Sequence, residues 1–194
     1  MSELESILKR INEIFKEAKL DYVIVGGIAI IHYGHIRATH DVDLIIENDS
    51  SKFPQLLKLL KSNDFDVIED QFYKGYKENT HISIFDIKSY MMLDIKISTK
   101  ESEKEIIKNS LKQSVFGSEI KIASLEQVLI GKILYLGNID EVPDSDILEY
   151  QDVFDFLTLY HSNKQKIDEK LIEEKIKEVG LESTLNRLKS FRLN

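Results

Sequence analysis

The chain has 194 residues, a formal net charge of −8, 42% hydrophobic residues and no cysteine. The absence of cysteine excludes a disulfide scaffold, thiolate catalysis and any zinc or iron–sulfur site with cysteine ligands. The acidic balance argues against a broad, non-specific nucleic-acid surface, although it does not exclude a local basic groove.

The first 122 residues alternate helix and strand signals. Apolar residues recur at helical spacing from Ser2 to Ala18, and Ser2 and Glu5 have the spacing of a capping box. The run 21–25 is short and β-branched and stops at Gly26-Gly27, which is typical of a buried strand followed by a tight turn. The remaining elements predicted in this part are a helix over 28–33, a strand over 40–47, a helix over 52–61, a strand over 65–69, a polar connection over 71–80, strands over 81–87 and 90–97, a helix over 98–113 and a strand or hairpin over 115–122.

The pattern changes at Ser124, where Ser124 and Gln127 form another capping box. All later segments have helical patterns, and the predicted helices cover 124–136, 144–160, 165–179 and 181–190. We therefore predict an α/β (α+β) fold with two parts. Residues 1–122 would form a mixed sheet flanked by helices, and residues 123–194 a helical subdomain packed on it.

Three features coincide between residues 25 and 46. Gly26-Gly27 ends a strand and opens a helix, where free backbone N–H groups can hold a phosphate. Asp41 and Asp43 are two residues apart on a predicted strand, so both carboxylates leave the same face. Adjacent carboxylates repel each other unless a cation lies between them, and oxygen ligands favour Mg²⁺ or Mn²⁺. Each feature alone is more often a plain turn or a solvated face, but their coincidence indicates a site for a metal and a phosphate.

This segment resembles the signature of the nucleotidyltransferase superfamily that includes DNA polymerase β. That signature places a hydrophobic-Gly-Gly/Ser turn before an Asp-hydrophobic-Asp-hydrophobic-hydrophobic strand. The matching positions are Gly26, Gly27, Asp41 and Asp43, followed by Leu44, Ile45 and Ile46. The lead-in Arg37-x-Thr39-x-Asp41 is similar to the group of AbiEii-type toxins and minimal nucleotidyltransferases, which is the nearest likeness. The resemblance covers about the first 100 residues well and the helical part loosely.

The resemblance implies a third carboxylate on a neighbouring strand. Asp94 has the hydrophobic-Asp-hydrophobic context, and its strand runs into a helix that we expect to be capped by Ser98. Asp86 is the alternative, and it also reads as a strand-end residue before a turn. We prefer Asp94 as the third carboxylate.

The helical part adds three candidate residues. Lys132 resembles the lysine with which the family contacts nucleotide phosphates, although an exposed helix lysine is an equally plain interpretation. It does not belong to a P-loop, because Ile133 stands where that motif needs Ser or Thr. Asp152 and Asp155 resemble the Arg-Asp-x-x-Asp pattern of AbiEii-like proteins, with Gln151 in place of the basic residue. The alternative for these two aspartates is an ordinary helix face.

The resemblance implies transfer of a nucleoside monophosphate from an NTP co-substrate to a hydroxyl of an acceptor, with release of pyrophosphate. The residues implied in catalysis and in binding Mg²⁺ or Mn²⁺ are Asp41, Asp43 and Asp94. The residues implied in nucleotide binding are Gly26, Gly27, Arg37, Thr39 and Lys132. Thr39 would either orient Asp41 or contact phosphate.

Two other functions are compatible with the sequence. One is a non-catalytic nucleotide-binding module on the same fold, and the other is a toxin–antitoxin component that acts through a protein partner. The acceptor stays open between tRNA, a protein and a small molecule, and a homodimer or an antitoxin-type partner is compatible with the pattern. No apolar run approaches the roughly 18 residues of a membrane span, and the first residues lack the plan of a signal peptide. We therefore expect a cytoplasmic protein with no membrane partner.

Overall fold

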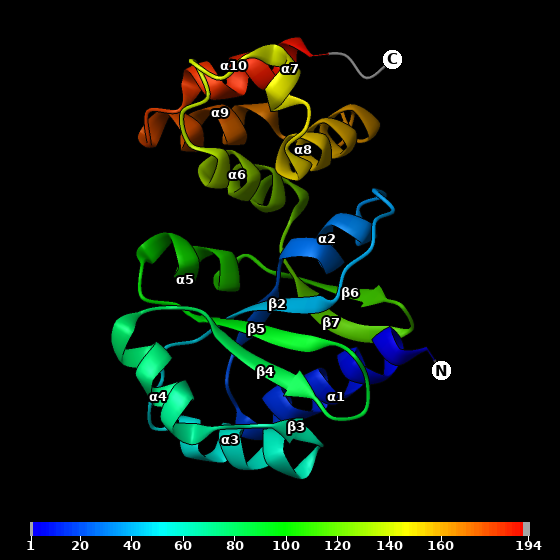
Figure 1. Cartoon of the computed structure of the whole chain (residues 1–194), viewed down its shortest axis with the longest axis vertical. Coiled ribbons are helices and arrows are strands. Elements are labelled where there is room, and N and C mark those ends of the chain that lie inside the picture. Colours follow the sequence, from blue (N-terminus) through cyan, green and yellow to red (C-terminus); the bar gives the residue numbers. More distant parts are fainter. Residues whose placement is uncertain (1, 192–194) are drawn as a thin grey trace. The chain divides into compact units, whose positions relative to one another are not determined.

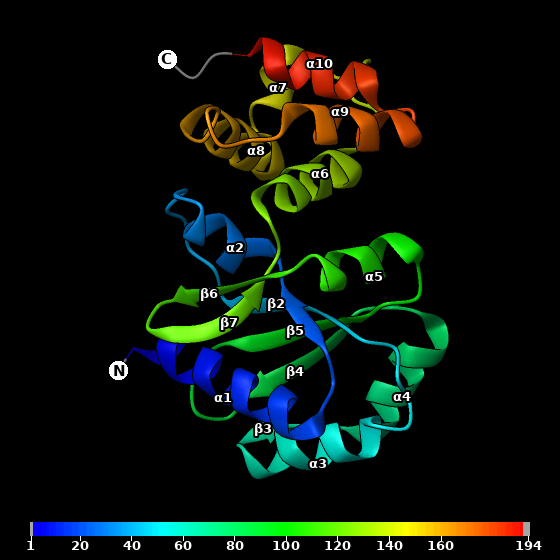
Figure 2. The same ribbon diagram turned by 180° about the vertical axis from the view of Figure 1, so that it is seen from behind.

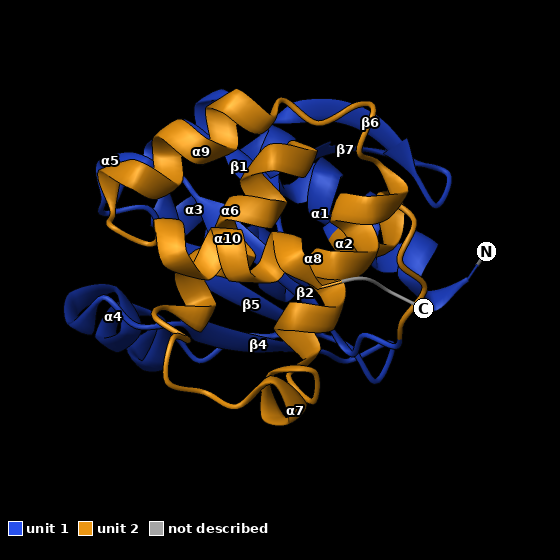
Figure 3. Cartoon of the chain, turned by 90° about the horizontal axis from the view of Figure 1, so that it is seen from above, with its two compact units in different colours: residues 1–29, 38–123 blue, residues 30–37, 124–194 orange. Residues whose placement is uncertain are grey.

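The computed structural model describes residues 2–191, which form two compact units (Figure 3). Unit 1 takes in residues 1–29 and 38–123, and unit 2 takes in residues 30–37 and 124–194, each as far as it is described. Helix α2 (Gly26–His32) therefore begins in unit 1 and ends in unit 2. No pattern in the sequence indicates that 30–37 associates with the C-terminal helices. The division into a domain of residues 1–122 and a helical subdomain of residues 123–194 stays a prediction.

Unit 1 is built on a seven-stranded mixed sheet, which confirms the predicted α/β class (Figure 1). The strand order is β3-β4-β5-β2-β1-β7-β6. The strands are β1 (Tyr22–Ile24), β2 (Asp41–Ile46), β3 (Phe65–Asp66), β4 (Ile82–Asp86), β5 (Met92–Ile97), β6 (Leu111–Val115) and β7 (Ser118–Ile122). β2 pairs with β5, and β1 with β7, in parallel, whereas the other pairs are antiparallel.

Helices cover both faces of this sheet. The helices that lie wholly in unit 1 are α1 (Glu3–Ala18), α3 (Phe53–Ser62), α4 (Glu69–Glu78) and α5 (Glu101–Lys108). Figures 1 and 2 show α1 and α3 on one side of the sheet and α5 on the other. α1 buries an apolar stripe at helical spacing, and Ser2 caps it by accepting a hydrogen bond from the Glu5 N–H, as predicted.

The two central strands alternate strictly between buried and half-buried residues. The buried side chains, none more than 3% exposed, are Val42, Leu44, Ile46, Leu93, Ile95 and Ile97. Because side chains alternate along a strand, this core fixes which face the intervening polar residues occupy. Asp41, Asp43 and Asp94 are therefore all directed to the opposite face.

Two predicted segments differ from the structure of unit 1. The expected connection 71–80 is largely helix α4, in which only Phe72 and Gly75 are buried, so its apolar period is too weak to signal a helix. The expected helix 98–113 ends at Lys108, and β6 follows as an edge strand that is mostly exposed and therefore polar. The start of α5 is capped by Glu103, which accepts hydrogen bonds from the Thr99 and Lys100 N–H groups, rather than by the Ser98–Glu101 pair.

Unit 2 is helical after residue 124, as predicted. Its helices are α6 (Leu125–Leu136), α7 (Asp144–Ile147), α8 (Gln151–Ser162), α9 (Glu169–Glu178) and α10 (Glu182–Ser190). Ser124 and Gln127 form the predicted capping box at the start of α6. The predicted continuous helix 144–160 is wrong, because the chain breaks between α7 and α8. Within residues 2–191, no helix is both long enough and apolar enough to cross a lipid bilayer.

A buried ion pair ties α1 to the end of β4. The Arg10 guanidinium donates to both oxygens of Asp86, at 2.8 and 2.6 Å, and the Asp86 side chain is fully buried. Ser89 Oγ also donates to this carboxylate at 2.6 Å. Burial opposes the charge of Asp86, but the hydrogen bonds from Arg10 and Ser89 outweigh it and lower the pKa of the carboxyl group. The Asp86 carboxylate therefore has a structural role, which is to hold α1 against the buried face of the sheet.

We expect Asp86→Asn to lower the free energy of unfolding by about 3 kcal/mol at pH 7, because it leaves Arg10 buried without its charge partner. A lowered folded pKa gives stability that is complete above the unfolded carboxyl pKa and is lost as the pH falls through the folded value. Urea unfolding at several pH values from 7 downward should show the gap between the wild type and the variant narrowing below about pH 4. A gap that stays constant over this range would contradict this role for Asp86.

Candidate active site

Three carboxylates lie together on the face of the sheet opposite the apolar core. In the parallel register of β2 and β5, Asp43 is the direct partner of Asp94, and Asp41 is the partner of Met92. All three aspartates are half-buried. Two of them share a strand and the third stands beside them, so this row is the densest group of acidic side chains on that face of β2 and β5.

The neighbouring strand β4 extends the same face. Ser83 is the register partner of Asp94, and Phe85 is the register partner of Met92. Both Ser83 and Phe85 are exposed, and Phe85 keeps 61% of its surface accessible. A polar position and an aromatic position therefore lie next to the carboxylates on the side away from β1.

The Gly26-Gly27 turn packs directly against Asp43. Gly26 has φ +58°, and a Cβ atom at this position would stand 1.8 Å from Asp43 Oδ2. The Gly27 N–H donates to the same oxygen at 3.2 Å, and the Val25 N–H donates to the Asp43 carbonyl at 3.0 Å. Glycine is required at position 26 both by the left-handed backbone and by this close approach. The sequence indicated a role for these glycines toward phosphate, and it did not indicate their contact with Asp43.

Each of the other two carboxylates also has a defined neighbour. Thr39 Oγ1 donates to Asp41 Oδ1 at 2.8 Å, which is the orienting arrangement considered for Thr39. His81 Nδ1 lies 3.0 Å from Asp94 Oδ2. His81 was not singled out from the sequence, where nothing but its position just before a strand distinguishes it. Asp94 Oδ1 is buried and has no hydrogen-bond donor among the described residues.

The row has the chemistry of a site for a hard divalent cation. Its donors are carboxylate oxygens only, and a buried carboxylate oxygen without a donor is an uncompensated partial charge that a cation would satisfy. Within residues 2–191, no three His, Asp or Glu side chains are arranged as a complete metal site.

The alternative third carboxylate, Asp86, lies elsewhere. It belongs to the buried set of β4 and is paired with Arg10 on the face covered by α1. The alternation of β4 therefore separates it from the row formed by Asp41, Asp43 and Asp94.

A second cluster of charges is found in unit 2, centred on Asp155. This side chain is fully buried and accepts hydrogen bonds from Lys132 Nζ at 2.6 Å, Arg37 Nη1 at 2.7 Å and Gln151 Nε2 at 3.0 Å. His35 Nδ1 lies 3.2 Å from the same carboxylate. Asp155 thus joins α8, α6 and the segment 30–37, and it fixes two of the residues predicted to contact nucleotide.

Lys132 has a second carboxylate partner. Its Nζ donates to Asp152 Oδ1 at 2.6 Å, and the Asp152 side chain is 27% exposed, whereas that of Lys132 is 13% exposed. Lys132 is therefore not a free helix lysine. The two cations of this cluster, Lys132 and Arg37, are matched by two carboxylates, of which only Asp152 is open to solvent.

Residues 2–129 match the model of a family described as "Nucleotidyltransferase of unknown function (DUF6036)". No curated protein sequence matches the chain. Among solved structures, the chain is similar to the crystal structure of ANT(2")-Ia in complex with adenylyl-2"-tobramycin, with 16% identity, 95% of this chain and 99% of that chain covered, and a TM-score of 0.59. It is also similar to an antigenic nucleotidyltransferase-like protein from Paracoccidioides brasiliensis, with 22% identity, 81% and 75% coverage, and a TM-score of 0.52. At these identities the structural likeness establishes the fold, and the finer resemblance to AbiEii-type toxins stays a prediction.

We expect Gly26→Ala to destabilise the protein by at least about 1 kcal/mol, because the new Cβ overlaps Asp43 and the backbone is left-handed. Gly131→Ala is the matched control: Gly131 lies in α6, has no atom within 4 Å of an added Cβ, and should gain up to about 1 kcal/mol in helix propensity. Urea unfolding of both variants measures the difference. Equal stability of the two would contradict the packing of Gly26 against Asp43.

We expect Asp155→Asn to lower the free energy of unfolding by about 3 kcal/mol, since Lys132 and Arg37 lose their buried counter-charge. Asp146→Asn, an exposed aspartate of α7, should change it by no more than about 0.5 kcal/mol. Both values follow from chemical denaturation monitored by circular dichroism. A loss below 1 kcal/mol for Asp155→Asn would mean that its partners are satisfied without it.

Proposed function

From the premise that this chain belongs to the family of nucleotidyltransferases described as DUF6036, we propose that it transfers a nucleoside monophosphate from an NTP to a hydroxyl group. The acceptor oxygen attacks the α-phosphorus and forms a new P–O bond. The bond from the α-phosphorus to the oxygen that bridges it to the β-phosphate breaks, and pyrophosphate leaves with the electron pair. The proton of the acceptor hydroxyl is lost, so the products are the nucleotidylated acceptor, pyrophosphate and one proton.

The observation that carries this proposal is the pairing of Asp43 with Asp94 in adjacent parallel strands, with Asp41 two residues away on the same face. Phosphoryl transfer asks for positioning and for neutralisation of charge more than for covalent help from the protein. A fixed row of carboxylates on a rigid sheet provides such positioning.

The carboxylates suited to hold Mg²⁺ or Mn²⁺ are Asp41, Asp43 and Asp94. When bound there, the cation would neutralise phosphate charge and orient the reacting oxygens. The support for this assignment is the oxygen-only donor set and the buried Asp94 Oδ1 that lacks a donor.

We assign the acceptor side of the site to Asp94. Asp94 is the carboxylate of the row that lies beside β4, and its Oδ2 contacts His81, so we give it the role of accepting the proton of the hydroxyl. Ser83, the exposed register partner of Asp94 on β4, would border the acceptor.

We assign the triphosphate to the residues predicted for it. Gly26 and Gly27 hold Asp43 against the start of α2, and Thr39 holds Asp41. Lys132 and Arg37 would neutralise the charge of the leaving pyrophosphate. Both are held by buried Asp155, so they lose little conformational freedom on meeting an anion.

We expect Asp41→Asn, Asp43→Asn and Asp94→Asn each to reduce NTP-dependent release of pyrophosphate by at least about 100-fold, because each removes a charge on which the reaction depends. Removal of divalent cations with EDTA should do the same to the wild type. The assay supplies each of the four NTPs with Mg²⁺ and offers tRNA, protein extract or small hydroxyl compounds as acceptors.

Two aspartates serve as controls in the same assay. Asp66→Asn alters an exposed residue of β3 and should leave turnover unchanged. Asp86→Asn should lower stability but keep turnover per folded molecule, which separates it from Asp94→Asn. Tight NTP binding without turnover on any acceptor would favour the non-catalytic module instead. Full turnover in Asp94→Asn together with its loss in Asp86→Asn would reverse the assignment of the third carboxylate.

A further inference from the structure

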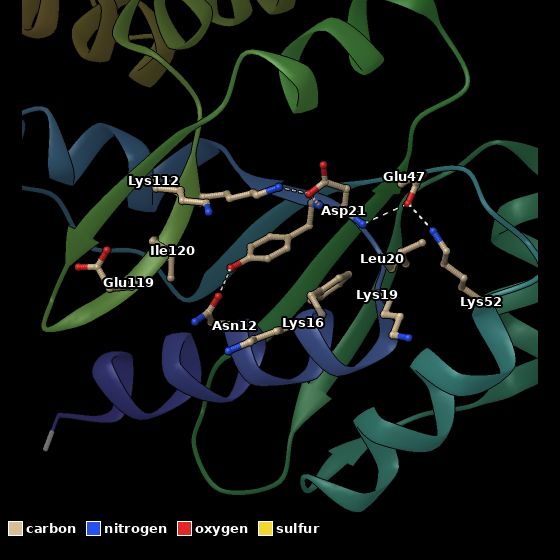
Figure 4. Close-up of a pocket in the computed structure, with 13 residues that line it drawn as sticks. Asn12, Lys16, Lys19, Leu20, Asp21, Glu47, Lys52, Lys112, Glu119 and Ile120 are labelled. Carbon is tan, nitrogen blue, oxygen red and sulfur yellow. Dashed lines mark hydrogen bonds and ion pairs between the residues drawn. The ribbon is translucent and has the colours of Figure 1, made fainter.

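Unit 1 contains a cavity of about 640 Å³ that is separate from the carboxylate row (Figure 4). It lies between the C-terminal half of α1, the start of β1 and the hairpin β6–β7. Five lysines line it: Lys16, Lys19, Lys52, Lys112 and Lys121. A volume of this size suits a small ligand rather than a single ion.

The cavity is distant from the candidate active site along β2. Asp43, the nearest aspartate of the row along β2, lies four residues before Glu47, which lines the cavity, so the two are about 13 Å apart at 3.3 Å per residue. Glu47 continues the alternation of Asp41 and Asp43, whereas other parts of the lining lie on the opposite face of the sheet. Tyr22 of the cavity packs its ring on Phe15 of α1, while Asp41 and Asp43 are on the face opposite α1.

The lining is basic although the chain as a whole is acidic. Its five lysines face three carboxylates, Asp21, Glu47 and Glu119, which leaves a local charge of plus two in a chain of net charge −8. An anionic ligand would therefore be drawn to this place against the field of the whole molecule.

Three of the lysines carry this charge. Lys121 is paired with Asp21, and Lys52 with Glu47 and Asp49. In the part of the chain that the structure describes, Lys16, Lys19 and Lys112 have no carboxylate within ion-pair distance. Lys16 and Lys19 come from the last turn of α1 and its C-cap, and Lys112 from β6, so three ammonium groups from two elements border one cavity.

The wall of the cavity offers neutral polar groups. The Tyr22 hydroxyl donates to Asn12 Oδ1 at 3.3 Å. Burial raises the pKa of Tyr22 to about 12, so its hydroxyl stays uncharged and adds no negative charge to the cavity. The amide group of Asn12 brings further donors to the same wall.

A second cavity, of about 420 Å³, continues the first one. The two share Asp21 and Glu47, and the second adds Lys104 and Lys108 from α5. Lys104 is paired with Glu101, whereas Lys108 has no ion-pair partner within residues 2–191. The basic lining thus extends beyond the reach of one phosphate group.

We propose that this pair of cavities binds a small anion that carries two or more phosphate groups. Lysine acts as a point charge toward phosphate, and the unpaired lysines, offset in part by Glu119, leave a positive lining that suits an oligophosphate. Nucleic acid fits the place less well, because its aromatic lining residues, Phe15 and Tyr22, are buried and offer no ring for base stacking. The net charge of −8 would also repel a nucleic-acid chain that continued past the cavity. This site is independent of the proposed transferase activity.

The test is isothermal titration of the full chain, without Mg²⁺, using inorganic tripolyphosphate, pyrophosphate and ATP as three separate probes. Tripolyphosphate should bind with an affinity that falls as salt is raised. The variant Lys16→Ala/Lys112→Ala should bind it at least about tenfold more weakly, since it loses two charged hydrogen-bond donors. The ranking of the three probes tells whether free oligophosphate or a nucleotide is the better ligand.

The matched control is Lys58→Ala/Lys74→Ala, which removes two exposed lysines of α3 and α4 that lie outside the cavity. It should bind tripolyphosphate like the wild type. All of the substituted lysines are exposed, so their variants should keep the melting temperature of the wild type.

Two results would overturn the proposal. They are the absence of tripolyphosphate binding and equal weakening in both lysine pairs. Binding of a 20-nucleotide single-stranded RNA that depends on Lys16 and Lys112, with no binding of tripolyphosphate, would identify a nucleic-acid surface instead.

Discussion

The parallel pairing of β2 with β5 is the constraint on which the candidate active site depends. Six apolar side chains of these two strands enter the core. Because side chains alternate along a strand, the intervening positions must lie on the opposite face of the sheet. The register puts Asp43 beside Asp94, so hydrophobic burial, rather than any attraction between carboxylates, brings the acidic groups together. A shift of one residue in either strand would bury an aspartate and expose a leucine or isoleucine, so a change of register would lower the stability of the fold.

Two aspartates with fully buried side chains show how a buried charge is stabilised in this protein. Asp86 is satisfied by Arg10 and Ser89, and Asp155 by Lys132, Arg37 and Gln151. In each case several charged or polar donors offset the loss of hydration. Asp94 differs from both, because one of its oxygens is buried without a donor. The contrast separates two aspartates with satisfied, structural carboxylates from the one that we propose as part of the active site.

Local patterns were enough to predict the class of the fold, the strands β2 and β5, the Ser2 cap of α1 and the capping box of α6, because these depend on near neighbours in sequence. The helix α4 and the edge strand β6 were missed, since both bury too few apolar residues to show a period. Spacing placed Asp41 and Asp43 on one face, and the family resemblance pointed to Asp94 as the third carboxylate. The His81–Asp94 contact depends on two strands meeting in register, which neither signal reports. The hydrogen bond from Arg37 to Asp155 joins residues that are 118 positions apart in sequence, and no local pattern predicts a contact of that separation.

The placement of residues 30–37 bears on how the chain is assembled during synthesis. These residues leave the ribosome early, but their partners in unit 2, such as Asp155 and Asn163, follow more than a hundred residues later. All residues of unit 1 have left the ribosome once residue 123 has emerged, so unit 1 can form before residues 30–37 meet their partners in unit 2. Contacts of such long sequence separation are slow to form. We therefore expect unit 2 to fold last, when its C-terminal helices are available to pack with residues 30–37.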